Sequence, residues 1–308
     1  MLRGPAGKHD RMTESRMTWE HGETWYRILG DLDPGADQVP VVLLHGGPGA
    51  THDYLEPAAD LVHETGRAVV LYDQLGCGSS TRLPDAPHEF WTVDLFKQEL
   101  SLLLEHLGIA ARYTLLGQSW GGMLAMENAI DQPAGLVGLV VADSPASIPL
   151  WVAEANRLRA ELPSEVEATL RRHEEAGTTD TPEYVEAVQV FYDRHLCRVP
   201  MPEPVARSFA LLDEDPTVYH AMNGPSEFHV IGSLRTWDIT DRLHRIAVPT
   251  LLVSGRYDEA TPAVVAPVHE AIAGSGWVVI EDASHMPHVE KPTEFRDVVN
   301  SFLAGLDH

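Results

Sequence analysis

The sequence predicts an α/β protein with a mostly parallel, doubly wound sheet and an inserted helical cap. Short, continuously apolar runs alternate with helix-length amphipathic segments, as in a parallel sheet that is buried on both faces. A Gly-x-Ser-x-Gly turn separates one apolar run from a helix-forming run. Between residues 145 and 237 the pattern becomes helical, with breaks that contain Pro and Gly, and no strand-like run interrupts it.

These observations divide the chain into three parts. We expect the α/β core over residues 17–144 and 238–308, and the helical cap over 145–237. Residues 1–16 are polar and partly basic, and no apolar segment follows them, so they do not resemble a secretory signal. We expect residues 1–16 to form a disordered N-terminal extension.

The individual elements follow from local pattern. Aromatic and β-branched residues over 17–29 indicate a strand pair. Buried strands are expected over 39–44, 68–72, 113–116, 136–142, 249–254 and 277–280. Core helices are expected over 92–107, 123–129 and 293–303, and cap helices over 149–162, 164–176 and 182–196.

Composition excludes several classes of partner. The 308 residues include 22 Lys and Arg against 46 Asp and Glu, a formal net charge of −24. Such a surface repels phosphate backbones and anionic lipids, so neither nucleic acid nor a membrane is an expected partner. The only cysteines, Cys77 and Cys197, favour a reducing compartment, and we expect a cytoplasmic protein. Neither has neighbours typical of a metal site, and no cofactor is expected.

The Gly-Gln-Ser-Trp-Gly sequence at 117–121 has the form of a nucleophile elbow. In this turn between strand and helix, the serine adopts a strained backbone conformation that exposes its oxygen. Glycines on either side let the strand and the helix pass closely. The N-terminus of the following helix offers free N–H groups to an oxyanion. Ser119 is therefore the predicted nucleophile.

A serine nucleophile needs a base, and the base needs an acid that orients it. Asp258 lies just beyond one predicted strand, and His285 lies in the loop after the next. The order Ser, acid, His is that of α/β-hydrolases. His288 and Asp282 are weaker alternatives. His288 lies further from the strand end, and Asp282 is too near His285 in sequence to approach it from a separate loop.

Two backbone N–H groups would hold the oxyanion. One comes from the residue after the nucleophile, Trp120, and the other from the loop after the first buried parallel strand. That loop is His-Gly-Gly-Pro-Gly at 45–49, and Gly47 is the expected donor. The loop lacks both glycine patterns that cradle nucleotide phosphates.

Several motifs together resemble the prolyl aminopeptidase (proline iminopeptidase) family of α/β-hydrolases, most closely its tricorn-interacting aminopeptidase branch. The matching segments run from about residue 20 to the C-terminus. They are His-Gly-Gly-Pro-Gly at 45–49, His-Asp-Tyr-Leu at 52–55, Asp-Gln-x-Gly-Cys-Gly-x-Ser at 73–80, Gly-Gln-Ser-Trp-Gly-Gly at 117–122, Met-Asn-Gly-Pro-Ser-Glu-Phe at 222–228, Trp-Asp-Ile-Thr-Asp at 237–241 and Tyr-Asp-Glu at 257–259.

The resemblance implies a serine exopeptidase that releases an N-terminal residue, often proline, from small peptides through an acyl-enzyme. Family members bind the free α-ammonium of the substrate with glutamates, and the matching positions are Glu227 and Glu259. An ammonium buried beside the reacting carbonyl needs such carboxylate partners. The resemblance implies no metal and no cofactor.

Other functions remain open at this point. The same machinery could cleave amino-acid amides or esters that carry a free α-amine. A hydrolase of neutral esters or lactones would cleave N-acetylated substrates equally well. A binding protein that has kept the fold and lost activity would not react with a phosphonylating probe at Ser119. The preferred first residue and the oligomeric state do not follow from the sequence.

Overall fold

A computed structural model describes residues 11–33 and 35–307 of the chain. Its centre is one eight-stranded sheet with the order β1-β2-β4-β3-β5-β6-β7-β8. The two pairings that involve β2 are antiparallel, and the other five are parallel. The strands are β1 (Met12–Trp19), β2 (Gly22–Leu29), β3 (Val41–Leu44), β4 (Val69–Tyr72), β5 (Tyr113–Gln118), β6 (Leu136–Ala142), β7 (Thr250–Gly255) and β8 (Gly276–Ile280). The predicted, mostly parallel, doubly wound sheet is confirmed.

Helices cover both faces of the sheet. They are α1 (Glu56–His63), α2 (Val93–His106), α3 (Trp120–Ile130), α9 (Pro262–Ala271), α10 (Pro287–Glu290) and α11 (Pro292–Ala304). Alternate side chains of β3 enter two separate cores. Val42 and Leu44 belong to the core that includes α2, α3 and α9, whereas Val41 and Leu43 belong to the core that includes α1 and α11. Burial on both faces explains why β3 and β4 are continuously apolar.

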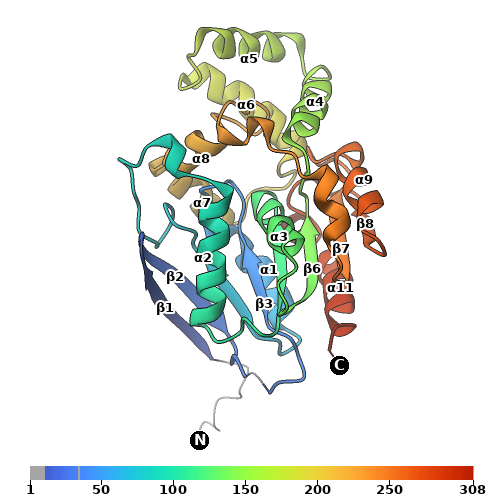
Figure 1. The fold of residues 1–308 in the computed structure, drawn as a ribbon. Coiled ribbons are helices and arrows are strands. Elements are labelled where there is room, and N and C mark those ends of the chain that lie inside the picture. The colour runs from blue at the N-terminus through green and yellow to red at the C-terminus, as the bar shows by residue number, and fades with distance from the viewer. Residues whose placement is uncertain (1–10, 34, 308) are drawn as a thin grey trace, which may run out of the picture.

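Five more helices lie within residues 145–237, and α4, α5 and α6 gather beyond one end of the sheet (Figure 1). They are α4 (Ile148–Arg159), α5 (Ser164–Ala176), α6 (Pro182–His195), α7 (Glu203–Glu214) and α8 (Thr217–Met222). Leu158, Leu170 and Phe191, from α4, α5 and α6, share a small apolar core of their own with Phe228. The helical pattern of this segment is present, and the division into core and cap domains stays a prediction.

The sequence prediction for the N-terminal segment was wrong in part. Residues 12–16, expected in a disordered extension, form the first half of β1 and pair with β2 in register. Local pattern did not reveal this strand because its first five residues are all exposed, which leaves no apolar alternation. Arg27 of β2 binds Glu14 at 2.8 Å across the pair. Residues 1–10 lie outside the described part of the chain.

Short 3₁₀ helices also occur among the described residues. They are η2 (His52–Leu55), η3 (His88–Phe90), η4 (Ser233–Thr236) and η5 (Thr240–Arg245). None of the helices in the described ranges combines the length and the apolar character needed to cross a membrane.

Candidate active site

Ser119 lies in a sharp turn between β5 and α3. Its φ of 57° and ψ of −125° place a non-glycine residue in a conformation that L-amino acids rarely adopt. A Cβ on Gly117 would come within 2.1 Å of the Gly121 carbonyl oxygen, and one on Gly121 within 1.9 Å of the Leu44 oxygen. Both glycines are therefore required sterically, as the Gly-x-Ser-x-Gly pattern predicts.

Asp258 and His285 meet in the structure although they are 27 residues apart. Asp258 follows β7, His285 lies in the loop after β8, and His285 Nδ1 is 2.7 Å from Asp258 Oδ1. Both side chains are buried. Burial disfavours the charged imidazolium, but the adjacent Asp258 carboxylate outweighs this effect and raises the pKa of His285. This histidine is therefore suited to accept a proton, and it lines the same cavity as Ser119.

The two alternative residues occupy other environments. His288 is buried, and its Nε2 lies 3.0 Å from the carbonyl oxygen of Tyr54. Burial lowers the pKa of His288 to about 4, so this ring is neutral at physiological pH. The Asp282 side chain is 74% exposed and faces Lys291 at 3.8 Å. These environments favour His285 and Asp258 over the alternatives.

Two backbone N–H groups beside Ser119 have no acceptor among the described residues: those of Gly47 and Trp120. Trp120 begins α3, where helical N–H groups lack partners within the helix. Gly47 has a φ of +106°, which favours glycine. The adjacent Gly46 N–H is unsuitable because it already donates to the Tyr54 hydroxyl at 2.6 Å. Gly47 and Trp120 both line a cavity with Ser119, as an oxyanion site requires.

The predicted glutamates lie beside these residues. Glu227 follows α8 and accepts a hydrogen bond from the Tyr219 hydroxyl at 2.7 Å. Glu259 directly follows Asp258, is fully buried, and has no hydrogen-bond donor within the described residues for either carboxyl oxygen. Its Oε1 is 3.9 Å from His285 Nε2. Burial, followed by the charges of Glu227 and Asp258, raises the pKa of Glu259 well above its ordinary value.

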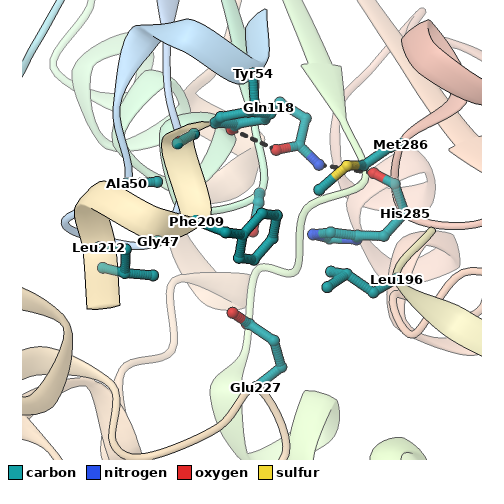
Figure 2. Close-up of a pocket in the computed structure, with 12 residues that line it drawn as sticks. Gly47, Ala50, Tyr54, Gln118, Leu196, Phe209, Leu212, Glu227, His285 and Met286 are labelled. Carbon is teal, nitrogen blue, oxygen red and sulfur yellow. Dashed lines mark hydrogen bonds between the residues drawn. The ribbon is translucent and has the colours of Figure 1, made fainter. Parts of the chain in front are cut away.

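Cavities open on two sides of Ser119, and Glu227 lines both. The first, here called the Phe209 cavity, holds about 390 Å³ of space, part of it open to solvent, and is drawn in Figure 2. Its walls include His285, Leu196, Phe209, Leu212 and Met286. The second, here called the Trp151 cavity, holds about 280 Å³, also partly open to solvent, and its walls include Trp120, Met123, Ile148, Trp151 and Leu234.

Sequence reasoning missed several residues of this site. Tyr54 donates to Gln118 Oε1 at 2.6 Å, and Gln118 Nε2 donates to the carbonyl oxygen of His285 at 2.8 Å, as the dashed lines in Figure 2 show. This chain links η2, the elbow and the histidine loop. Trp151 packs edge-on against His285 with ring centroids 5.8 Å apart. Tyr54 and Gln118 lie inside motifs that resemble the family, but Phe209 on α7 left no local signal.

One group of side chains has the spacing of a metal site: His52, Asp53 and Glu56, whose potential ligand atoms lie within 4.8 Å of one another. Both carboxylates already have cationic partners, however. Arg207 binds Asp53, and it reaches Glu56 at 3.1 Å, while Arg27 binds Glu56 at 2.6 Å. We therefore interpret this group as the anchor that holds α7 against η2.

Comparison with known proteins gives the same family as the motifs. The alpha/beta hydrolase fold family matches residues 39–292. The proline iminopeptidase of Saccharolobus solfataricus is 41% identical over 264 residues, which cover 85% of this chain and 84% of that protein. The proline iminopeptidase of Lactobacillus helveticus is 38% identical over 294 residues, which cover 94% of this chain and 97% of that protein.

Two solved structures are similar to this protein over nearly the whole chain. The crystal structure of a proline iminopeptidase from Mycobacterium smegmatis shares 47% identity and has a TM-score of 0.88, covering 96% of this chain and 99% of that chain. The crystal structure of VinJ shares 52% identity with the same coverage and has a TM-score of 0.93. The predicted tricorn-interacting branch stays a prediction. The chain belongs to the proline iminopeptidase family of α/β-hydrolases.

Proposed function

We propose that this protein is an aminopeptidase that releases an N-terminal residue, with proline among the preferred ones, from small peptides. The observation that carries this proposal is the buried glutamate pair beside the nucleophile. Glu227 lines both cavities next to Ser119, and Glu259 is fully buried 3.9 Å from His285. A carboxyl group buried without donors is unfavourable, and an ammonium group of the substrate would supply them.

Ser119, His285 and Asp258 supply the nucleophile, the base and the acid. His285 Nε2 removes the Ser119 proton as the oxygen attacks the carbonyl carbon, and Asp258 holds the imidazolium that forms. The N–H groups of Gly47 and Trp120 stabilise the oxyanion. His285 then protonates the leaving amine, and an acyl-enzyme remains on Ser119. Water, activated by His285, releases the amino acid by the reverse sequence.

The position of His285 decides which cavity holds which part of the substrate. Because His285 gives its proton to the leaving nitrogen, the leaving part must lie on the side that His285 lines, which is the Phe209 cavity. The first residue then occupies the Trp151 cavity, between Trp120 and Trp151. Its α-ammonium lies near Glu227, the residue common to both cavities. Flat aromatic walls suit a proline ring.

Names of relatives support this substrate class: the two curated relatives compared above and one structural relative are proline iminopeptidases. Residues Cys77 and Cys197 are both free thiols and both buried, which fits the proposed cytoplasmic location. The proposed reaction uses only groups of the chain and water. An amidase or esterase for amino-acid amides or esters with a free α-amine is the second candidate, because the same residues would serve an ammonia or alcohol leaving group.

The test is product analysis on a matched pair of substrates. A neutral pentapeptide that begins with proline and prolinamide are each incubated with the wild type and with Ser119→Ala, and products are identified by mass spectrometry. We expect the wild type to release proline from the peptide and to leave the rest of the peptide intact. Ser119→Ala should release none. Cleavage of prolinamide alone would support the amidase, and internal cleavage of the peptide would contradict an exopeptidase.

A further inference from the structure

We infer that the Phe209 cavity is a subsite for an uncharged, apolar second residue of the substrate, which makes this enzyme selective on both sides of the cleaved bond. The inference rests on the proposed function, because it takes the leaving part of the peptide to lie in this cavity. The walls facing Ser119 and His285 are Leu196, Phe209 and Leu212. In Figure 2 the Phe209 ring and the Leu196 side chain lie beside His285.

Besides the groups assigned to catalysis and Glu227, the polar side chains that line this cavity are paired with the protein. The Tyr54 hydroxyl bonds Gly46 and Gln118, and Gln118 also donates to the His285 carbonyl. The Ser208 hydroxyl accepts from the N–H of Thr51 at 3.1 Å. A polar side chain that entered here would lose its water and gain few partners, which is unfavourable. An apolar side chain gains from the same burial.

The charge of the residues that line the cavity also favours an uncharged second residue. Among the described residues that line the cavity there is no lysine or arginine, and one of these residues is Glu227. A carboxylate at the second residue would therefore meet repulsion from Glu227, and no lysine or arginine would compensate for it. The free carboxylate of a dipeptide would meet the same repulsion. A longer peptide or a peptide amide is then a better substrate than the dipeptide.

The helix that carries part of the apolar wall is anchored to η2 and to α1. Phe209 and Leu212 lie on α7, and Arg207 of the same helix pairs with Asp53 of η2 and with Glu56. The Ser208 hydroxyl joins α7 to the loop before η2 through Thr51. A rigid wall can discriminate between side chains because it does not move to accommodate them.

The test measures kcat/KM on tripeptide amides Pro-X-Gly-NH₂ with leucine, phenylalanine, asparagine or aspartate at X. Full burial of a leucine side chain corresponds to about ten- to a hundredfold in binding. We expect at least about tenfold higher kcat/KM for leucine and phenylalanine than for asparagine, and lower values still for aspartate. Leu212→Ala should reduce this preference. Leu211→Ala, the same change on the same helix outside the cavity, should leave it unchanged.

The outcomes separate this inference from the proposed function. Equal kcat/KM for all four peptides, with proline still released, would overturn the subsite and leave the aminopeptidase intact. Release of proline from none of them would overturn both. A preference that survives Leu212→Ala and also Phe209→Ala would place the selective contacts elsewhere and contradict the inference.

A second, independent observation concerns Asp143, which follows β6. The geometry assigns it as a positioning residue: a neutral carboxyl that donates its proton to the second oxygen of Asp258. Asp143 is buried beside β7, where its N–H donates to Val253 at 2.9 Å and its Oδ1 accepts from Gly255 at 3.1 Å. Its Oδ2 and Asp258 Oδ2 are both buried and have no donor among the described residues, and the Asp258 N–H donates to the carbonyl oxygen of the same Gly255 at 3.4 Å.

Only one of two adjoining buried carboxyls can be ionised readily. Asp258 faces His285 and needs its negative charge, so the proton belongs to Asp143. Burial and the Asp258 charge raise the pKa of Asp143 well above its ordinary value, in agreement with this assignment. Glu290 and Tyr54 also face Asp143. The shared proton orients the Asp258 carboxylate and draws part of its negative charge away from His285.

Two substitutions and a pH profile test this role. Asp143→Ala removes the donor, so the pKa of His285 should rise and the acid limb of kcat/KM should move to higher pH. Asp143→Asn retains a donor for Asp258 and an acceptor for Gly255. We expect Asp143→Asn to have the acid limb of the wild type. Its kcat/KM should be at least about tenfold higher than that of Asp143→Ala. An acid limb that does not move in Asp143→Ala, or equal losses in both variants, would overturn the assignment.

Discussion

Replacing Glu259 by glutamine gives the sharpest test of substrate-amine binding, because it changes charge with almost no change in shape. The carboxyl is fully buried and has no donor among the described residues, and its pKa is raised by burial and by Glu227 and Asp258. The protonated form of Glu259 is therefore favoured in the free protein. An ammonium group beside it favours the carboxylate, so binding of the substrate should release that proton.

The size of the effect follows from the interaction that is lost. A hydrogen bond to a charged group contributes about 1.5–3 kcal/mol, against about 0.5–1.5 kcal/mol for a neutral one. The difference of about 1–2 kcal/mol corresponds to roughly 5- to 30-fold in kcat/KM for a free-amine substrate. Folding should not suffer, because glutamine removes a titratable group from a buried position.

The assay is kcat/KM against pH for proline p-nitroanilide and its N-acetyl derivative, with Glu105→Gln, an exposed change on α2, as the control. Wild-type kcat/KM for the free amine should rise with pH as Glu259 loses its proton, until the substrate amine is deprotonated near its pKa of about 7.7–8.0. Glu259→Gln should abolish that rise and leave the acetylated substrate unaffected. An equal loss on both substrates, or no loss on either, would refute the role of Glu259.

Three further outcomes are expected. Asp258→Asn should lower kcat by about 10⁴-fold at pH 7, because His285 loses the carboxylate that holds its charged form; a loss under tenfold in steady-state kinetics would exclude Asp258 as the triad acid. The KM of free-amine substrates should rise above about pH 8, and Glu227→Gln should raise it at lower pH too; a KM that is flat to pH 10, together with no effect of Glu227→Gln, would contradict ammonium binding. Glu99 is buried, and its pKa is about 7 against an ordinary value of 4.5. Folding therefore favours the neutral carboxyl, and the free energy of unfolding should fall as pH rises through 7. Between pH 6 and pH 8.5, urea denaturation should show that the free energy of unfolding of the wild type falls by roughly 1.4 kcal/mol relative to that of Glu99→Gln. If the two free energies of unfolding changed equally with pH, Glu99 would not be neutral in the folded protein.

Features that depend only on neighbouring residues in the sequence could be predicted from the sequence alone. The strands β3, β4 and β6 consist of apolar residues and one glycine because both faces are buried, so their pattern is visible without knowing their neighbours. The elbow at Ser119 requires glycine at 117 and 121 for steric reasons that hold in any chain. Such a turn is recognisable in the sequence before its structure is known. The fold and the family were therefore predicted correctly.

Features that depend on distant contacts were not predictable in this way. The first half of β1 is exposed and owes its conformation to pairing with β2. Phe209 reaches the site because Arg207, two residues before it, is paired with η2 some 150 residues away in sequence. The environment of Asp143 depends on the neighbouring strand β7, whose Gly255 N–H donates to its carboxyl. The assigned roles of the triad, the oxyanion donors and the glutamates stay predictions. Two adjoining cavities are lined by the predicted residues Ser119, His285, Gly47, Trp120 and Glu227, whereas Asp258 and Glu259 are buried and line neither.

The most direct test of the proposed aminopeptidase activity compares wild-type kcat/KM on p-nitroanilides of proline, alanine, leucine and phenylalanine. Each compound is measured with a free and with an acetylated amine. Two charge-assisted contacts to the ammonium, each of about 1.5–3 kcal/mol, predict a preference for free amines of at least about a hundredfold. We expect cleavage of the free-amine compounds, with the highest kcat/KM for proline. Equal cleavage of the acetylated compounds would contradict the amine site and leave only a serine hydrolase of another specificity.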